Sequence, residues 1–351
     1  MWPKTHLIDL LGIEHPIIQA PMAGSTTVEL AAAVSNAGGI GSMGYSETSV
    51  ETIREDAEKI RKLTDKPFNL NFFAHDTPVS KADVIESTRE RLSPFYAQAG
   101  LSEIPRDVSK PLLTFTEEKL ELLLEIKPPL VSFHFGLPES SAIELLKSAG
   151  CRILCSATTT AEAIALELAG VDLIVAQGWE AGGHRGSFDV NHEDHGIGIM
   201  ALVPQIADAV NIPLIAAGGI ADGRGIAAAF MLGACGVQMG TAFLSCPEAS
   251  VSDVHLEAIR NAKDDDTRLT RAFSGRPARA RRNNYIESMA VCRDPLPDFP
   301  TMYSLSGPLM ATSGETLDFR FLLYGQAAAL NREMPAAELV QTLVTEARNL
   351  L

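Results

Sequence analysis

Residues 152–177 read RILCSATTTAEAIALELAGVDLIVAQ, and this stretch contains a complete strand–helix–strand unit. The apolar run Arg152–Ala157 predicts a strand. A helix is expected over residues 160–169, because Gly170 is suited to the left-handed cap at a helix C-terminus. A second apolar run, Asp172–Gly178, predicts the next strand. Two strands joined by one helix in this way indicate a βα unit of a parallel sheet.

The same unit recurs along the chain, because glycine-containing junctions of this kind also precede Cys151, Ile40 and Gly236. Eight parallel strands within about 250 residues favour an α/β fold of the (β/α)8 type, a TIM barrel, over an open sheet. The expected strands are Pro16–Gln19, Gly39–Gly44, Phe68–Phe73, Leu130–Gly136, Arg152–Ala157, Asp172–Gly178, Pro213–Gly218 and Gly236–Phe243.

Two regions depart from the regular alternation. Residues 76–129 are long for one connection and predict an insertion with an extra helix and loop over the barrel. After the last strand the pattern becomes mostly helical, so we expect a barrel over residues 1–245 and a helical C-terminal appendage over residues 246–351. Helices are expected around Val251–Ala262, Arg320–Leu330 and Ala336–Leu350, and the appendage can include the eighth helix of the barrel.

The composition excludes several classes of protein. The net charge of −15 argues against nucleic acid or an anionic membrane as a partner, because both repel an acidic surface. No apolar run approaches the roughly 20 residues needed to span a bilayer, and the N-terminal residues lack the apolar core of a signal peptide. The five cysteines contain no C-x-x-C pair and are expected to be reduced thiols. A cytoplasmic protein is therefore expected.

Glycines gather where a TIM barrel binds phosphate, after its last two strands. The seventh predicted strand runs into AAGGIADGRG at residues 216–225, and the eighth contains GVQMGT at residues 236–241. Because glycine lets the backbone approach a ligand closely, the N–H groups of Gly219, Gly240 and Thr241 are expected to bind a phosphate. Ordinary βα turns are the alternative interpretation of these glycines.

Residues 39–44, GIGSMG, match the G-x-G-x-x-G pattern of dinucleotide-binding sites. In those sites a helix begins within the motif, after the strand. Here the motif is itself the expected second strand, so the glycines are interpreted as a closely packed strand and not as a nicotinamide site.

The sixth predicted strand leads into WEAGGHRG at residues 179–186. A histidine framed by glycines at the carboxyl end of a barrel strand is a candidate catalytic imidazole, so His184 is the predicted reaction centre. A structural histidine is the alternative interpretation.

The remaining clusters of histidine, acidic and arginine residues are weaker indications of a functional site. Residues 192–195, HEDH, resemble a metal cluster, but consecutive loop residues rarely converge on one ion, and no metal is expected. His134, in the fourth predicted strand, is expected to pack in the core or line the pocket. A basic cluster could steer an anionic ligand or be ion-paired, and it consists of Arg276, Arg279, Arg281 and Arg282.

Taken together, these segments resemble the bacterial, FMN-dependent class of nitronate monooxygenases, once called nitropropane dioxygenases. The resemblance rests on QAPMAG at residues 19–24, an asparagine in the third strand, EAGGHRG at residues 180–186 and the two glycine-rich loops. It covers the chain through Phe243 and continues at residues 273–279. The C-terminal helices would cover the pocket.

The resemblance implies FMN as the cofactor and His184 as the active-site histidine. Residues of the first strand would line the flavin, two amide side chains would hydrogen-bond it, and glycines would permit its close approach. The implied cofactor-binding residues are Ala20, Pro21, Met22, Asn71, Gln177, Gly182, Gly219, Gln238, Met239, Gly240 and Thr241.

The implied reaction is the oxidation of an alkyl nitronate by O2 to a carbonyl compound and nitrite, with propionate 3-nitronate as the expected substrate. Because a nitronate is already deprotonated, His184 is expected to bind and polarise its nitro group. His184 would act as a base only on a neutral nitroalkane. A homodimer is the assembly to be tested.

Three alternatives remain open at this stage. An FMN- and NAD(P)H-dependent enoyl-acyl-carrier-protein reductase shares the barrel, the E-A-G-G-H motif and the phosphate loops. An NAD(P)H:quinone reductase on the same scaffold is a related option. A flavin-binding or phosphate-sensing protein without turnover is the third, although His184 and the complete set of loop glycines argue against it.

Overall fold

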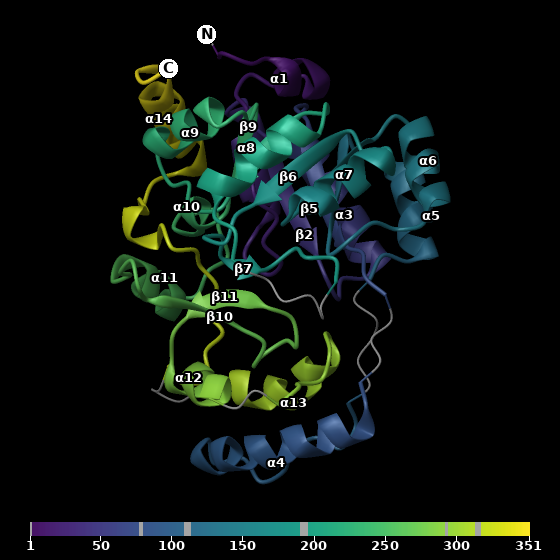
Figure 1. Ribbon diagram of the computed structural model, residues 1–351. Coiled ribbons are helices and arrows are strands. Elements are labelled where there is room, and N and C mark those ends of the chain that lie inside the picture. Colours follow the sequence, from purple (N-terminus) through teal and green to yellow (C-terminus); the bar gives the residue numbers. More distant parts are fainter. Residues whose placement is uncertain (1, 77–79, 109–113, 190–195, 292–293, 313–316) are drawn as a thin grey trace.

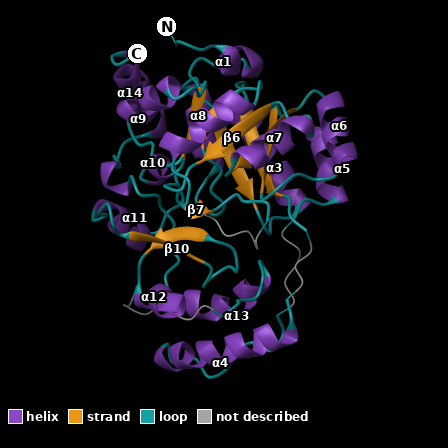
Figure 2. Ribbon diagram, viewed as in Figure 1, coloured by secondary structure: helices purple, strands orange, loops and turns teal. Residues whose placement is uncertain are grey.

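An eight-stranded parallel sheet forms the centre of the computed structural model, which describes residues 2–76, 80–108, 114–189, 196–291, 294–312 and 317–351 (Figures 1 and 2). The strand order is β1-β9-β8-β6-β5-β4-β3-β2. The sheet closes into a barrel because Ile18 of β1 bridges in parallel to Ile40, the residue before β2. The strands are β1 (Ile17–Gln19), β2 (Gly41–Tyr45), β3 (Phe68–Phe73), β4 (Leu130–His134), β5 (Arg152–Ala157), β6 (Leu173–Gln177), β8 (Leu214–Ala217) and β9 (Gly236–Met239).

The predicted (β/α)8 barrel is confirmed, since each predicted strand overlaps one strand of this sheet. The largest difference is at the last strand. The prediction extends it to Phe243, whereas β9 ends at Met239 and a short helix, α10 (Thr241–Leu244), follows. The chain therefore turns at Gly240, directly beside the predicted phosphate loop.

Helices cover the outside of the barrel, and most of them come directly after a barrel strand in the sequence. The last helix, α14, packs against α9 and α2 and so takes the place of the eighth barrel helix. Among the described residues, no helix combines the length and apolar character of a membrane span. The surrounding helices are α2 (Val28–Asn36), α3 (Val50–Leu63), α5 (Glu117–Ile126), α6 (Ser140–Ser148), α7 (Thr160–Leu168), α8 (Ile199–Ala209), α9 (Gly223–Met231) and α14 (Ala336–Arg348).

The amino end of the barrel is filled by apolar side chains. Helix α1 (His6–Leu11) covers this end, and its Leu7 is fully buried in one cluster with Ile18, Leu154 and Ile215 from the strands. Each fully buried Leu or Ile stabilises the fold by about 1.5–3 kcal/mol. Because this end is packed solid, a ligand can enter the barrel only from the carboxyl ends of the strands.

The glycine motif at residues 39–44 is explained by packing. A Cβ atom on Gly41 would lie 1.9 Å from the carbonyl oxygen of Ala31 in α2, and one on Gly39 would lie 2.7 Å from the carbonyl oxygen of Ile17. These glycines are needed because α2 and β1 approach the backbone of this segment closely. The interpretation of residues 39–44 as a closely packed strand region is confirmed, with β2 occupying Gly41–Tyr45.

The insertion contains one extra helix, α4 (Ala82–Gln98), but this helix does not lie over the barrel. It packs against the C-terminal region, where Tyr96 is buried in one cluster with Tyr285, and its hydroxyl donates a 2.6 Å hydrogen bond to the carbonyl oxygen of Leu305. In Figure 1, α4 lies beyond α12 and α13, away from the strands. The predicted position over the barrel is therefore wrong.

The C-terminal region contains a small antiparallel sheet besides its helices. Strand β11 (Ala278–Arg281) pairs on one side with β10 (Thr267–Thr270) and on the other with β7 (Gly183–His184), which comes from the barrel. The helix predicted over Arg320–Leu330 is wrong, because only a single 3-10 turn, η1 (Ala328–Leu330), is present there. The other helices are α11 (Asp253–Arg260), α12 (Asn284–Val291) and α13 (Thr301–Met310).

Candidate active site

A cavity of about 630 Å³ opens at the carboxyl ends of the barrel strands. Its lining includes residues within or directly after each of the eight strands, which is where TIM barrels bind their ligands. This volume is typical of sites for small molecules and cofactors. The twelve residues predicted from the sequence all line it: Ala20, Pro21, Met22, Asn71, Gln177, Gly182, His184, Gly219, Gln238, Met239, Gly240 and Thr241.

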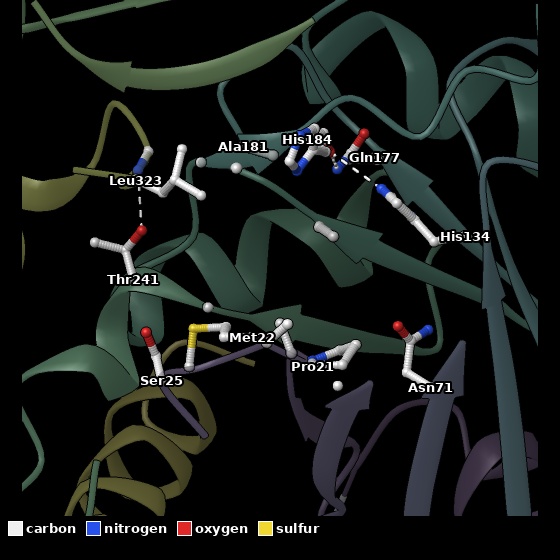
Figure 3. Close-up of a pocket in the computed structure, with 18 of the residues that line it drawn as sticks. Pro21, Met22, Ser25, Asn71, His134, Gln177, Ala181, His184, Thr241 and Leu323 are labelled. Carbon is white, nitrogen blue, oxygen red and sulfur yellow. Dashed lines mark hydrogen bonds between the residues drawn. The ribbon is translucent and has the colours of Figure 1, made fainter. Parts of the chain in front are cut away.

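The residues after β1 and β3 form one side of the cavity. Figure 3 shows Pro21, Met22 and Asn71 facing His184 and Gln177 across the cavity. The turn after β1 is fixed by a hydrogen bond of 2.8 Å from the backbone N–H of Ala20 to the carbonyl oxygen of Met239. This hydrogen bond keeps the loops that follow β1 and β9 side by side at one edge of the cavity.

The amide of Asn71 is oriented by a serine that the sequence reasoning missed. Its Nδ2 donates a 2.8 Å hydrogen bond to Oγ of Ser132, and Asn69 donates to the same oxygen at 2.9 Å. Ser132 also lines the cavity. One N–H of Nδ2 is engaged, so the side-chain oxygen Oδ1 remains to accept a hydrogen bond from a ligand and the second N–H remains to donate one.

The amide of Gln177 is used to hold the His184 segment. Its Nε2 donates to the backbone oxygen of His184 at 3.0 Å, and its Oε1 accepts from the backbone N–H of Gly186 at 2.7 Å. One N–H of the amide is left for a ligand. Gln177 therefore positions the candidate catalytic residue as well as lining the cavity.

His184 itself is fixed by the C-terminal region. It pairs with Ala278 in the small sheet, and its Nε2 lies 2.9 Å from Oγ of Ser274. The Ser274 hydroxyl also lies 3.1 Å from the carbonyl oxygen of Arg276, to which it can donate. Nδ1 of His184 makes no hydrogen bond to any residue that the structure describes, so this nitrogen is left for a bound molecule.

His184 is a neutral imidazole at neutral pH. Burial, together with the smaller effects of the nearby His134 and Arg276, lowers its pKa to about 3. The Ser274 hydroxyl has a single proton. If it donates to Arg276, then Nε2 of His184 carries the ring proton and Nδ1 is a proton acceptor. If it donates to His184 instead, Nδ1–H becomes a donor.

His134 is a lining residue and a partner of the His184 backbone, which agrees with the prediction that it packs or lines the pocket. Its Nε2 lies 3.1 Å from the carbonyl oxygen of His184, and its Nδ1 lies 2.6 Å from Oγ of Ser156. Burial lowers the pKa of His134 to about 4. Both ring nitrogens are engaged, so His134 supports the site without a free nitrogen for proton transfer.

The predicted phosphate loops present unpaired backbone donors. Gly219 has a left-handed backbone with φ of 70°, which favours glycine, and it lines the cavity together with Gly240 and Thr241. Within the part of the chain that the structure describes, the N–H groups of these three residues donate no backbone hydrogen bond. Unpaired N–H groups that converge on a cavity suit the oxygens of a phosphate.

The basic cluster does not line the cavity. The guanidinium of Arg276 is buried, 4.0 Å above the ring of Phe135, and Arg279 donates to the backbone oxygen of Trp179. Arg282 pairs with Glu287 at 2.7 Å on the surface. The ion-paired interpretation fits Arg282, whereas the charge of Arg276 lies close enough to His184 to lower the pKa of its imidazole. The HEDH segment at 192–195 lies outside the described residues, and none of the described residues form a metal-binding cluster.

Aromatic residues of the C-terminal region complete the cavity, and the sequence analysis did not single out Phe299, Tyr303 or Phe321. Phe299, Tyr303 and Phe321 all line it, with Tyr324 and Gly325 nearer Thr241. The backbone N–H of Gly325 donates to Oγ1 of Thr241 at 2.9 Å. Residues 295–303 read PLPDFPTMY, and two aromatic residues in nine do not specify a pocket.

Known proteins similar to this chain match it over nearly its whole length. The family model for nitronate monooxygenase matches residues 4–346. The nitronate monooxygenase of Pseudomonas aeruginosa is 46% identical over 349 residues, covering 97% of this chain and 98% of that protein. The structure of a nitroalkane oxidase from Streptomyces ansochromogenes has a TM-score of 0.90 and 37% identity, with 98% of each chain covered. FabK from Thermotoga maritima has a TM-score of 0.74 and 31% identity, covering 98% of this chain and 96% of that one. The chain therefore belongs to the nitronate monooxygenase family and is an oxidoreductase.

Proposed function

We propose that this protein uses FMN to oxidise alkyl nitronates with O2, giving a carbonyl compound and nitrite. The observation that carries the proposal is the position of His184, a neutral imidazole whose Nδ1 has no described partner, in the wall of the barrel cavity. Two nitronate ions and one O2 balance to two carbonyl compounds and two nitrite ions. The resemblance implies propionate 3-nitronate as one candidate substrate.

The cavity residues fit FMN. The N–H groups of Gly219, Gly240 and Thr241 would bind its phosphate, while Asn71 and Gln177 would hydrogen-bond the ring or ribityl chain. Gln238 and Met239 would support the phosphate loop, Gly182 would let the chain pass close by, and Ala20, Pro21 and Met22 would line the ring. Bound FMN would supply the group that accepts electrons from the nitronate and passes them to O2.

The protein itself would bind and orient the substrate beside His184. In the tautomer with Nδ1–H, His184 donates a hydrogen bond to a nitronate oxygen, as expected from the sequence. In the other tautomer, Nδ1 accepts the α-proton of a neutral nitroalkane. The Ser274 hydroxyl can rotate between Arg276 and His184, so it permits both tautomers.

The barrel and the C-terminal region would have different functions. Residues 1–245 would hold the flavin, and residues 246–351 would cover the substrate, with α14 returning to the barrel wall. The cytoplasmic location and the homodimer stay predictions.

Replacing Ser274 tests the tautomer argument. We expect Ser274→Ala to lower kcat/KM for a neutral nitroalkane by about tenfold, because the imidazolium formed at His184 loses its hydrogen-bond acceptor. Oxidation of the preformed nitronate should fall less. Ser274→Thr keeps a hydroxyl and should retain most of the activity with both substrate forms. An equal loss in the alanine and threonine variants would mean that Ser274 acts only through packing.

The reaction is tested by measuring O2 uptake and nitrite release by the flavin-loaded protein without NAD(P)H. Propionate 3-nitronate and an uncharged alkyl nitronate are each supplied. Uptake with nitrite release from either supports the proposal. No uptake with either would contradict it.

A reductase that uses NAD(P)H is the second candidate function. The similarity to FabK, at a TM-score of 0.74, is the observation that favours it. Bleaching of the flavin by NAD(P)H, together with failure to oxidise any nitronate, would establish this candidate.

A further inference from the structure

The wall around His184 is aromatic. Four rings that line the cavity surround its imidazole, and three of them come from the region after residue 245. All four make T-shaped contacts with the imidazole. We call these four residues the aromatic chamber: Phe73, Phe299, Tyr303 and Phe321, whose ring centroids lie 6.4, 5.7, 6.5 and 6.1 Å from that of His184.

Among the described residues, the lining of the cavity contains a negative charge but no lysine or arginine. The negative charge is that of Glu47, the single carboxylate among these described lining residues. Glu47 lies close enough to Tyr303 to raise the pKa of its hydroxyl, after the larger effect of burial. The far wall of the chamber therefore has a carboxylate beside it and no described cation in it.

Positive charge is found instead near His184. The buried guanidinium of Arg276 lies 4.0 Å from the ring centroid of Phe135, and that centroid is 5.8 Å from the centroid of His184. Its field lowers the pKa of His184, so the field reaches the imidazole. A positive potential at this point favours the negatively charged nitronate group near His184. With the nitronate group held at His184, the tail of the substrate lies among the rings of the aromatic chamber.

From this arrangement we infer, given the proposed function, that the site selects nitronates with an uncharged hydrocarbon tail over nitronates with a carboxylate tail. Aromatic walls stabilise a hydrocarbon chain by excluding water from it. A carboxylate in the same place would lose its water without gaining a cationic partner among the described lining residues, which is strongly unfavourable. Propionate 3-nitronate is then the poorer substrate, although the family resemblance suggested it first.

The first test compares two nitronates of similar length on the flavin-loaded protein, the nitronate of 1-nitrobutane and propionate 3-nitronate. We expect kcat/KM to be at least about tenfold higher for the butyl compound, with most of the difference in KM. Equal or better use of propionate 3-nitronate would overturn this inference and leave the proposed function standing. Failure to oxidise either compound would overturn the proposed function and the inference with it.

A second test places a cation in the chamber wall. Gly307 lies one helical turn after Tyr303 in α13, lines the cavity, and has no atom within 4 Å of the position its Cβ would take. Gly307→Lys should raise kcat/KM for propionate 3-nitronate by about fivefold or more, through charge attraction. Gly307→Met, of similar length and uncharged, is the matched control and should not.

The pair of variants separates charge from shape. The inference is supported if the ratio of kcat/KM for propionate 3-nitronate to kcat/KM for the butyl nitronate rises in Gly307→Lys and not in Gly307→Met. If the lysine and methionine variants change both nitronates alike, the tail does not extend along this wall, and the inference is overturned.

Discussion

Replacing His184 by asparagine is expected to reduce kcat/KM for a neutral nitroalkane by about 100-fold or more, the usual contribution of a general base. Asparagine keeps a polar side chain but has no basic nitrogen to receive the α-proton. Oxidation of the preformed nitronate should fall by a smaller factor, because no proton has to be removed from it. The measurement is steady-state O2 uptake with both substrate forms.

The pH dependence gives a second readout of the same residue. Because burial holds the pKa of His184 near 3, the imidazole stays neutral, and able to accept a proton, well below pH 6.5. We therefore expect no loss of kcat/KM for the nitroalkane through titration of His184 between about pH 8 and about pH 5. Full activity of His184→Asn with both substrate forms would refute the role assigned to it.

Replacing Gly182 by alanine is expected to have the largest effect on the cavity itself. A Cβ at this position would lie 2.4 Å from the carbonyl carbon of Tyr324 and 2.5 Å from the backbone nitrogen of Gly325. Backbone atoms cannot move aside as a flexible side chain can. The segment that contains Tyr324 would have to shift, although Gln326 N–H is hydrogen-bonded to the Glu180 carbonyl oxygen at 3.0 Å.

We expect Gly182→Ala to destabilise the fold by about 1–3 kcal/mol, the usual effect of overpacking, and to weaken flavin retention. Thermal unfolding and the flavin content after gel filtration are the two measurements. Gly307→Ala is the matched control, since it lines the same cavity but has open space at its Cβ position. If both alanine variants unfolded at the same temperature as the original protein and kept as much flavin, the close contact of Gly182 with the backbone of Tyr324 and Gly325 would not be needed to maintain the cavity.

The barrel could be predicted from the sequence because short, largely apolar runs alternate with helical patterns along most of it. The small sheet could not. Thr267–Thr270 and Ala278–Arg281 read TRLT and ARAR, which resemble exposed loops, and β7 contributes only two residues. Their pairing depends on contacts between segments far apart in the sequence, and these contacts leave no local periodicity.

The missing helix at 320–330 has a similar cause. The segment FLLYGQAAAL at residues 321–330 is apolar enough to suggest a helix. In the structure its backbone N–H groups form hydrogen bonds with distant residues instead. Gly325 N–H donates to Oγ1 of Thr241, and Gln326 N–H donates to the carbonyl oxygen of Glu180. Tertiary hydrogen bonds therefore override the local helical preference and draw this segment across the cavity.

The candidate site was predictable only in its barrel half. Motifs after the strands identified His184 and the phosphate loops because TIM barrels place ligands at those ends. Ser274 lies 90 residues from His184 in the sequence, and no motif around the chamber residues Phe299 and Phe321 indicates a binding site. Partners of this kind become visible only when the fold brings them together.

The central claim is that a nitronate, and not a pyridine nucleotide, delivers electrons to the flavin in this cavity. The most direct measurement mixes the flavin-loaded protein without O2 with a nitronate in one sample and with NADH or NADPH in another, and follows the visible absorbance of the flavin. The account predicts rapid reduction by the nitronate, no reduction by either nucleotide, and nitrite release when O2 is admitted. Rapid bleaching by NADH or NADPH, with none by the nitronate, would contradict it.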